Sequence, residues 1–228
     1  MIAALLVAAG RGHRLGGPLP KQYRLLAGEP VLRHALRPFL HHPAIGLVRV
    51  VIHPDDAELY ASATQGLALP SPIFGGPTRQ DSVRLGLEAL AESSPRAVLI
   101  HDAARPLVAG ATIDSVIAAL KDAPGVIAAL PVADTLKRCV GDKVTDTLDR
   151  SNVWRAQTPQ GFRFPEILAA HRAAVGLALT DDAQVAERAG LEVRVVPGDE
   201  EAFKITNEPD LLRAEQILQI RNRLKDIT

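Results

Sequence analysis

Along the first 132 residues, short apolar runs alternate with longer segments in which apolar residues recur every three or four positions. The apolar runs end at glycine, proline or charged residues, and they predict buried strands at 1–8, 45–53, 71–74, 96–102 and 125–132. The segments between them predict helices at 31–42, 54–63, 78–92 and 111–121. Strands that alternate with helices are typical of parallel crossover units. We therefore expect an α/β fold, a Rossmann-like and mostly parallel sheet flanked by helices.

This pattern breaks at Asp134, where the segment 134–148 alternates apolar and polar residues around a Gly141–Asp142 pair. Such a pair is a common two-residue turn, so the segment predicts a hairpin. Further elements complete the chain: helices at 165–175 and 181–189, a strand at 191–198, and a helix from Pro209 with Asn207 as its cap. No repeat or linker interrupts the sequence. We expect one domain over 1–228, with a protruding hairpin arm at 134–150.

Charge and composition exclude several classes of protein. The 228 residues carry 26 basic and 26 acidic side chains, and this balance disfavours a general nucleic-acid binder, which normally has a basic excess. No apolar stretch reaches the roughly 20 residues of a membrane span, and no signal peptide is evident. A single cysteine excludes a disulfide framework. We expect a globular protein of the reducing cytoplasm, with neither nucleic acid nor membrane as partner.

The first strand runs into a glycine-rich, basic stretch, "AAGRGHRLGGPLPKQY" at 8–23. Glycines at the carboxyl end of a parallel strand let backbone N–H groups approach phosphates. Neither common fingerprint fits, because Pro18 follows the glycine pair where a Walker loop needs lysine, and Leu15 stands where a dinucleotide loop needs its third glycine. The stretch predicts another kind of phosphate loop, with Arg14 and Lys21 as its charges. A solvated surface loop is the alternative.

Other polar residues follow the ends of later strands. Gly75 and Gly76 precede a helix that has Thr78 as its predicted cap and Ser82 in its first turns. Asp102 ends the next strand, where one carboxylate together with substrate phosphates suits a divalent cation such as Mg²⁺. An ordinary helix turn and a surface pair of Asp102 with Arg105 are the alternatives.

His101 lacks a carboxylate relay in the sequence and is interpreted as structural. Thr158 and Lys204 lie outside any strong periodicity, and a solvated position is the alternative for Lys204.

Taken together, eight blocks resemble one family. "AAGRGHR", "PKQY", "GGPTRQDSV", "HDAARP", "DTLKR", "RAQTPQGF", "LTDDA" and "FKITNEPD" follow one another between residues 3 and 212. In this order they are similar to 2-C-methyl-D-erythritol 4-phosphate cytidylyltransferases, enzymes of the non-mevalonate isoprenoid pathway. The resemblance implies the nucleotidyltransferase type of α/β fold. It also implies transfer of cytidylyl from CTP to methylerythritol phosphate, Mg²⁺ as cofactor and a homodimer assembled through the 134–150 arm.

The resemblance also assigns roles to individual residues. Arg14 and Lys21 would neutralise charge on the α-phosphate and on the departing pyrophosphate, and Lys204 would join them in catalysis while holding the acceptor substrate. The implied nucleotide pocket comprises Ala8, Ala9, Gly10, Gly75, Gly76 and Ser82. Asp102 would hold the metal as well as substrate. The implied substrate-binding residues are Arg105, Thr158, Thr180, Asp134, Thr135 and Arg150, and three of these (Asp134, Thr135 and Arg150) lie on or beside the arm and would reach a neighbouring subunit's site.

Two departures from the family pattern stand in the nucleotide blocks. Pro77 replaces an acidic residue found in many members, and His13 replaces a residue that is often arginine. Two other functions stay open at this point. One is cytidylyl transfer to a different polyol phosphate such as ribitol 5-phosphate, against which "DTLKR", Arg150 and Thr158 argue. The other is a non-catalytic nucleotide-binding module, which the retained Arg14, Lys21, Asp102 and Lys204 disfavour.

Overall fold

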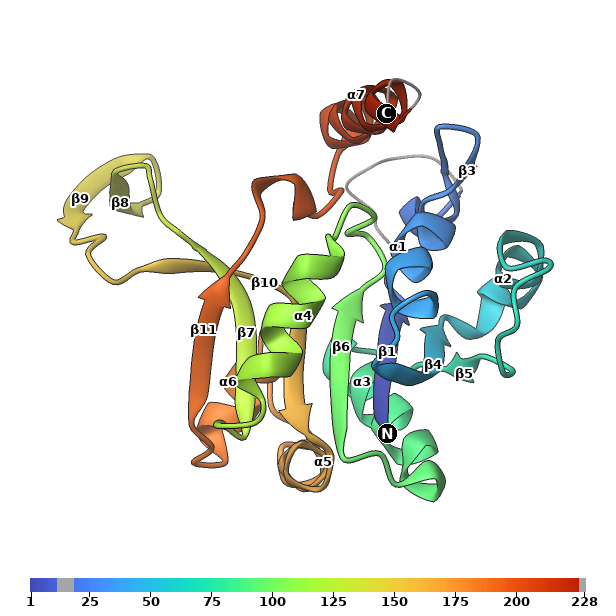
Figure 1. Cartoon of the computed structure of the whole chain (residues 1–228). Coiled ribbons are helices and arrows are strands. Elements are labelled where there is room, and N and C mark those ends of the chain that lie inside the picture. The colour runs from blue at the N-terminus through green and yellow to red at the C-terminus, as the bar shows by residue number, and fades with distance from the viewer. Residues whose placement is uncertain (12–18, 226–228) are drawn as a thin grey trace.

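A computed structural model describes residues 1–11 and 19–225, and its centre is a seven-stranded sheet of order β11-β7-β10-β6-β1-β4-β5 (Figure 1). The strands are β1 (Ile2–Ala8), β4 (Ile45–Ile52), β5 (Ile73–Phe74), β6 (Ala97–Asp102), β7 (Gly125–Pro131), β10 (Trp154–Arg163) and β11 (Val193–Pro197). β1 pairs in parallel with β4 on one side and with β6 on the other. The predicted mostly parallel α/β fold is confirmed.

Helices cover both faces of this sheet, because β1 sends alternate side chains to opposite sides. Leu6 packs in a core cluster with α1 (Val31–Leu40), α2 (Ala57–Ala63) and α4 (Gly110–Ala119). Leu5 packs in a second cluster with α3 (Arg79–Leu90), α5 (Phe164–Ala173) and α6 (Asp182–Arg188). A third cluster joins α7 (Glu208–Lys225) to Leu26 of β2 (Leu25–Leu26), which pairs with β3 (Glu29–Pro30).

Two helices start at the predicted capping residues, Thr78 and Asn207, and α6 starts at Asp181, a cap that was predicted to lie inside the helix. The Thr78 hydroxyl accepts a hydrogen bond from the Asp81 amide at 3.0 Å and donates to the Asp81 carboxylate at 2.7 Å. Asp181 caps α6 by accepting from the Gln184 amide, and the Asn207 side chain accepts from the Asp210 amide at 2.9 Å. These caps satisfy N–H groups that have no partner within the helix.

β10 is the main element that the sequence pattern does not predict. It runs antiparallel between β6 and β7 in the middle of the sheet. Its buried positions include Gln157, Thr158 and Gln160, and Pro159 lies where its register against β7 shifts. Polar side chains and a proline argue against a central strand. Here the polar groups are satisfied locally, since the Gln157 amide donates to the Asp199 carbonyl and that of Gln160 to the Asp181 carboxylate.

Between β7 and β10 the chain forms the hairpin of β8 (Leu136–Val140) and β9 (Lys143–Leu148). Within residues 1–11 and 19–225 the two strands pair only with each other, and Gly141 at the turn has φ +60°. Figure 1 shows this hairpin set apart from the seven-stranded sheet, and most of its side chains are exposed. The pairing agrees with the predicted hairpin, whereas its role in assembly stays a prediction.

The close contact of α3 with the sheet depends on a glycine. A Cβ at Gly86 would lie 2.6 Å from a methyl group of Leu5 and 2.8 Å from one of Val51. Both neighbours are fully buried, so neither can turn away into solvent. Any larger residue at this position therefore pushes the helix off β1 and β4.

We expect Gly86→Ala to destabilise the protein by about 1 kcal/mol. Overpacking costs roughly 1–3 kcal/mol and outweighs the gain of about 1 kcal/mol from alanine's higher helix propensity. Urea denaturation measures the change. Gly110→Ala is the matched control, because nothing lies within 4 Å of its added Cβ, and it should lose no stability. Equal stabilities of the two variants would contradict the packing argument.

Candidate functional site

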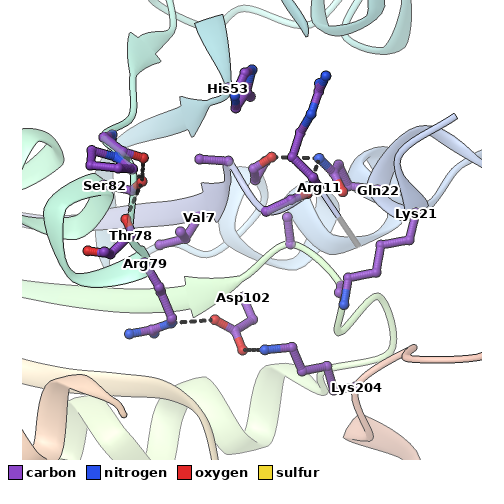
Figure 2. A pocket seen from close by; sticks show the side chains of 17 residues that line it. Val7, Arg11, Lys21, Gln22, His53, Thr78, Arg79, Ser82, Asp102 and Lys204 are labelled. Atoms are coloured by element: carbon purple, nitrogen blue, oxygen red, sulfur yellow. Dashed lines mark hydrogen bonds and ion pairs between the residues drawn. The ribbon is translucent and has the colours of Figure 1, made fainter. Parts of the chain in front are cut away.

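A cleft of about 370 Å³ opens at the carboxyl ends of the parallel strands. Its wall is formed by Val7–Gly10 at the end of β1, His53 after β4, the turn between β5 and α3, and Asp102–Ala104 at the end of β6. Lys21 and Lys204 enter it from elements far apart in the sequence (Figure 2). In open α/β sheets this edge is the usual place of ligand binding.

The Gly75–Gly76 turn is held against the cleft by Ser82. The Ser82 hydroxyl accepts a hydrogen bond from the Gly76 amide at 3.2 Å and donates to the Thr78 carbonyl at 2.9 Å. A Cβ at Gly75 would lie 2.6 Å from the Ser82 oxygen, and one at Gly76 would lie 2.5 Å from the Asp81 Cβ. Only glycine permits this approach. Gly76 and Ser82 line the cleft, and Gly75 lies behind them.

Lys21 and Gln22, at the end of the glycine-rich stretch, form another part of the cleft wall. Lys21 starts the 3₁₀ helix η2 (Lys21–Tyr23), and its ammonium donates to the Ile205 carbonyl at 3.0 Å. The buried Gln22 side chain donates to the carbonyls of Ala8 and Gly10, at 2.6 and 3.1 Å. These bonds fix the backbone where β1 ends. Arg14, the other predicted cation of this stretch, lies outside the described residues.

Asp102 is the carboxylate in the wall of the cleft, and it is held from two sides. Arg79 Nε donates to its Oδ1 at 3.2 Å, and the Lys204 ammonium donates to its Oδ2 at 2.7 Å. Figure 2 shows both contacts. Burial alone would raise the pKa of Asp102, but the charges of Arg79, Lys204 and Arg105 outweigh it and hold that pKa well below its ordinary value. The carboxylate stays ionised.

A chain of buried hydrogen bonds supports the turn that follows β6. The Asp102 amide donates to the Thr158 hydroxyl at 3.1 Å, and that hydroxyl lies 2.9 Å from His101 Nδ1. His101 Nε2 lies 3.1 Å from the Arg105 carbonyl. Burial lowers the pKa of His101 to about 4, so the ring is neutral and donates through Nε2. These contacts agree with the structural role predicted for His101. They also occupy the Thr158 hydroxyl with partners inside the protein.

The segment that precedes α7 docks on the same turn. The Ile205 amide donates to the Ala104 carbonyl at 2.8 Å, and the Arg105 guanidinium donates to the Ala202 carbonyl at 2.9 Å. This places Lys204 beside Asp102. Burial lowers the pKa of Arg105. Its Nε is buried without a hydrogen-bond partner among the described residues.

The remaining predicted residues do not line this cleft. Asp134, Thr135 and Arg150 are exposed at the base of the hairpin. Thr180 is exposed before α6, where its amide and hydroxyl donate to the Gln184 side chain at 2.8 and 3.1 Å. Arg105 and Thr158 are likewise not among the residues that line it. The described chain therefore brings together five of the six nucleotide-pocket residues, Lys21, Asp102 and Lys204, and leaves the six implied substrate-binding residues outside the cleft.

Four polar lining residues are not predicted from the sequence: Gln22, Arg79, His53 and Arg11. Gln22 and Arg79 belong to the "PKQY" and "GGPTRQDSV" blocks. The sequence identifies these blocks but does not predict which contacts the two side chains make. Arg11 pairs with Asp56 at 2.7 Å, and Asp56 is almost fully buried. Nothing in the order of residues along the chain predicts that pair.

Asp102 alone provides only part of the oxygen ligands that a magnesium ion needs. No group of three or more histidine, cysteine or acidic side chains suited to a metal lies within residues 1–11 and 19–225. Magnesium in proteins is commonly held by one or two carboxylates, with waters and substrate phosphates as the other ligands. An ionised carboxylate in the wall of the cleft meets that requirement once phosphates are present.

In the described part of the chain, none of the helices is both long and apolar enough to cross a membrane.

Comparison with known proteins supports the resemblance. The chain is 59% identical over 219 residues to the bifunctional enzyme IspD/IspF of Rhodospirillum rubrum, and the match covers 96% of this chain and 57% of that one. The chain thus spans little more than half the length of the first curated relatives it matches. It is 50% identical to the 2-C-methyl-D-erythritol 4-phosphate cytidylyltransferase of Cereibacter sphaeroides KD131, over 96% of this chain and 97% of that one.

Solved structures give the same result. A crystal structure of a 4-diphosphocytidyl-2C-methyl-D-erythritol synthase superposes with a TM-score of 0.83 at 33% identity, covering 95% of this chain and 97% of that one. The bifunctional IspDF of Campylobacter jejuni superposes with a TM-score of 0.78 at 25% identity, over 93% of this chain and 53% of that one. The model of the IspD family, 2-C-methyl-D-erythritol 4-phosphate cytidylyltransferase, matches residues 2–220, and the chain belongs to this family.

Proposed function

We propose that this chain transfers cytidylyl from CTP to 2-C-methyl-D-erythritol 4-phosphate, giving 4-diphosphocytidyl-2-C-methyl-D-erythritol and pyrophosphate in isoprenoid precursor biosynthesis. The observation that carries the proposal is the cleft in which Lys21, Asp102 and Lys204 meet a glycine-lined wall. Family membership supports the choice of substrates. The single exposed cysteine is compatible with the reducing cytoplasm expected from the sequence.

The reaction requires charge neutralisation rather than a covalent intermediate. A phosphate oxygen of methylerythritol phosphate attacks the α-phosphorus of CTP, a new P–O bond forms, and the bond to the β-phosphate oxygen breaks to release pyrophosphate. The attacking phosphate is already deprotonated near neutral pH, so no general base is needed. Positioned cations that stabilise the developing charge are the main source of rate in such transfers.

The described residues support distinct parts of this reaction. Backbone groups at Ala8–Gly10 and at the Gly76 turn line a narrow pocket, which suits a pyrimidine nucleoside. Lys21 stands on the side of the glycine-rich segment, where the triphosphate would lie, and Lys204 stands beside Asp102. We assign these two cations to the phosphates, together with Arg14. Arg105, Thr158 and Thr180 remain assigned to the acceptor substrate by resemblance alone.

We propose Asp102 as the protein ligand of a magnesium ion whose other ligands are the nucleotide phosphates and water. The bound ion would neutralise phosphate charge during the transfer. Lys204 and Arg79 already touch both oxygens of Asp102, so the ion and these cations would share the carboxylate.

We further propose a homodimer assembled through the 134–150 arm. An isolated two-stranded hairpin is marginal in water, and this one exposes Val140 and Val144 by 72% and 55%. Trp154 beside it is 46% exposed. A partner's identical arm would cover these apolar side chains, and two-fold pairing is the commonest form of association. It would also carry Asp134, Thr135 and Arg150 toward the neighbouring cleft.

The proposed reaction is tested by pyrophosphate release with methylerythritol phosphate and each of the four nucleoside triphosphates. We expect turnover with CTP and at least about tenfold less with the purine nucleotides, because a narrow backbone-lined pocket excludes the larger base. Ribitol 5-phosphate in place of methylerythritol phosphate is the control for the acceptor. Equal or faster turnover on ribitol 5-phosphate would assign the chain to that substrate instead.

Excess chelator should abolish turnover, and Asp102→Asn should lower it by about 10²-fold while raising the magnesium concentration for half-maximal rate. The asparagine keeps the shape of the side chain but loses the charge that the ion needs. Asp114→Asn, at an exposed position on α4, is the matched control and should keep the wild-type magnesium dependence. Full activity in chelator would remove the metal from the mechanism.

Replacement of residues 134–150 by a short Gly-Asn turn should give an inactive monomer. Pro131 and Trp154 are paired neighbours in the sheet, so a short connection can join β7 to β10 without changing their register. Light scattering measures the mass, and the pyrophosphate assay measures the activity. A variant that stays dimeric, or a monomer with normal turnover, would show that the arm is not the assembly device.

A further inference from the structure

In the wall of the cleft, Arg79 is shared between two carboxylates. Its Nε donates to Asp102 Oδ1 at 3.2 Å, and its Nη2 donates to Asp182 Oδ2 at 2.8 Å. The shorter bond is therefore the one that leads away from the cleft. Together with Lys204 on the other oxygen of Asp102, the four side chains form a line of alternating charge: Lys204, Asp102, Arg79, Asp182.

Asp182 lies at the buried end of this line. Its side chain is 1% exposed, it is the first residue of α6, and it is not among the residues that line the cleft. The fully buried His171 on α5 lies on its other side, with Nε2 3.3 Å from Oδ1. Burial alone would raise the pKa of Asp182, but Arg79 and His171 lower it below its ordinary value, so the carboxylate is ionised.

The competition between the two carboxylates sets how Arg79 holds Asp102. A guanidinium facing one carboxylate donates two parallel N–H bonds to it. Here Asp182 occupies Nη2, so Asp102 receives a single bond from Nε and keeps its second oxygen for Lys204. Without the charge at Asp182, we expect Arg79 to turn Nη2 onto Asp102 as well, which would rotate the Asp102 carboxylate relative to Lys204.

We propose that Asp182 is a positioning residue of the nucleotide site: by holding Arg79 from behind, it keeps Asp102 oriented toward Lys204 and the phosphates of CTP. The inference rests on the proposed function, because it takes CTP as the ligand of the cleft. It assigns a role in ligand binding to a buried side chain that does not itself touch the cleft.

A purely structural role makes different predictions. If the pair of Arg79 with Asp182 served only to pin α6 to α3, its loss would lower the melting temperature and leave the CTP affinity of the folded protein unchanged. The two roles are separated by a double-mutant cycle, since residues that act through one another show non-additive effects.

Isothermal titration calorimetry with CTP alone measures the affinity of the full chain, because no turnover occurs without the acceptor. We expect Asp182→Asn and Arg79→Lys each to weaken CTP binding by about tenfold, and the double variant to bind no more weakly than Arg79→Lys. Asp182→Glu should recover most of the affinity. Asp181→Asn is the matched control: it removes the neighbouring acid, which caps α6 and bonds to Gln160 rather than Arg79, and should stay within about twofold of wild type.

Each outcome has one meaning. Wild-type affinity in folded Asp182→Asn, or single effects that simply add in the double variant, would overturn the inference and leave the proposed function standing. If circular dichroism shows that Asp182→Asn does not fold, Arg79→Lys decides alone. Lysine keeps the charge but has one nitrogen in place of the two, Nε and Nη2, that hold the two carboxylates, and unchanged CTP binding in this variant would overturn the inference. A wild-type chain that does not bind CTP would overturn the proposed function and this inference together.

Discussion

A buried carboxylate at the end of β6 is the constraint around which this cleft is arranged. Asp102 could not remain ionised at 11% side-chain exposure without compensating charges. They come from three separate parts of the chain: Arg79 at the start of α3, Arg105 in the following turn and Lys204 before α7. The charge on Asp102 thus brings α3, the turn after β6 and the segment before α7 together at one point.

Most of the sheet could be predicted because its strands obey a simple rule. A strand buried on both faces reads as a continuous apolar run, as β1 and β6 do. β10 breaks this rule, since its centre carries Gln157, Thr158 and Pro159. Those polar groups are tolerated because partners from other segments, such as the Asp199 carbonyl and the Asp181 carboxylate, meet them in the folded protein. Local sequence contains no sign of such distant partners.

The candidate site shows the same limit, because contacts between residues far apart in the chain cannot be predicted from local sequence. Lys21, Asp102 and Lys204 stand in recognisable blocks, and the position of Asp102 at a strand end follows from periodicity alone. Arg79 is the first residue of a predicted helix and looks solvated, yet its pKa is raised: burial alone would lower it, and the charges of Asp182 and Asp102 outweigh that effect. Its partners are 23 and 103 positions away in the chain. Pairs of this separation depend on how α3, α5 and α6 pack, which no short motif specifies.

The docking of residues 202–205 on the turn after β6 has a consequence for how the protein is made. Lys21 and Ile205, which are 184 positions apart, share a hydrogen bond, so one wall of the cleft is synthesised well before the segment that closes it. A nascent chain that has emerged only through β11 already has every strand of the sheet. It still lacks the cation on Asp102 Oδ2 and the backbone partner of Ala104. The sheet can therefore form on the ribosome before the cleft does, and the cleft is completed only when residues 202–205 have emerged.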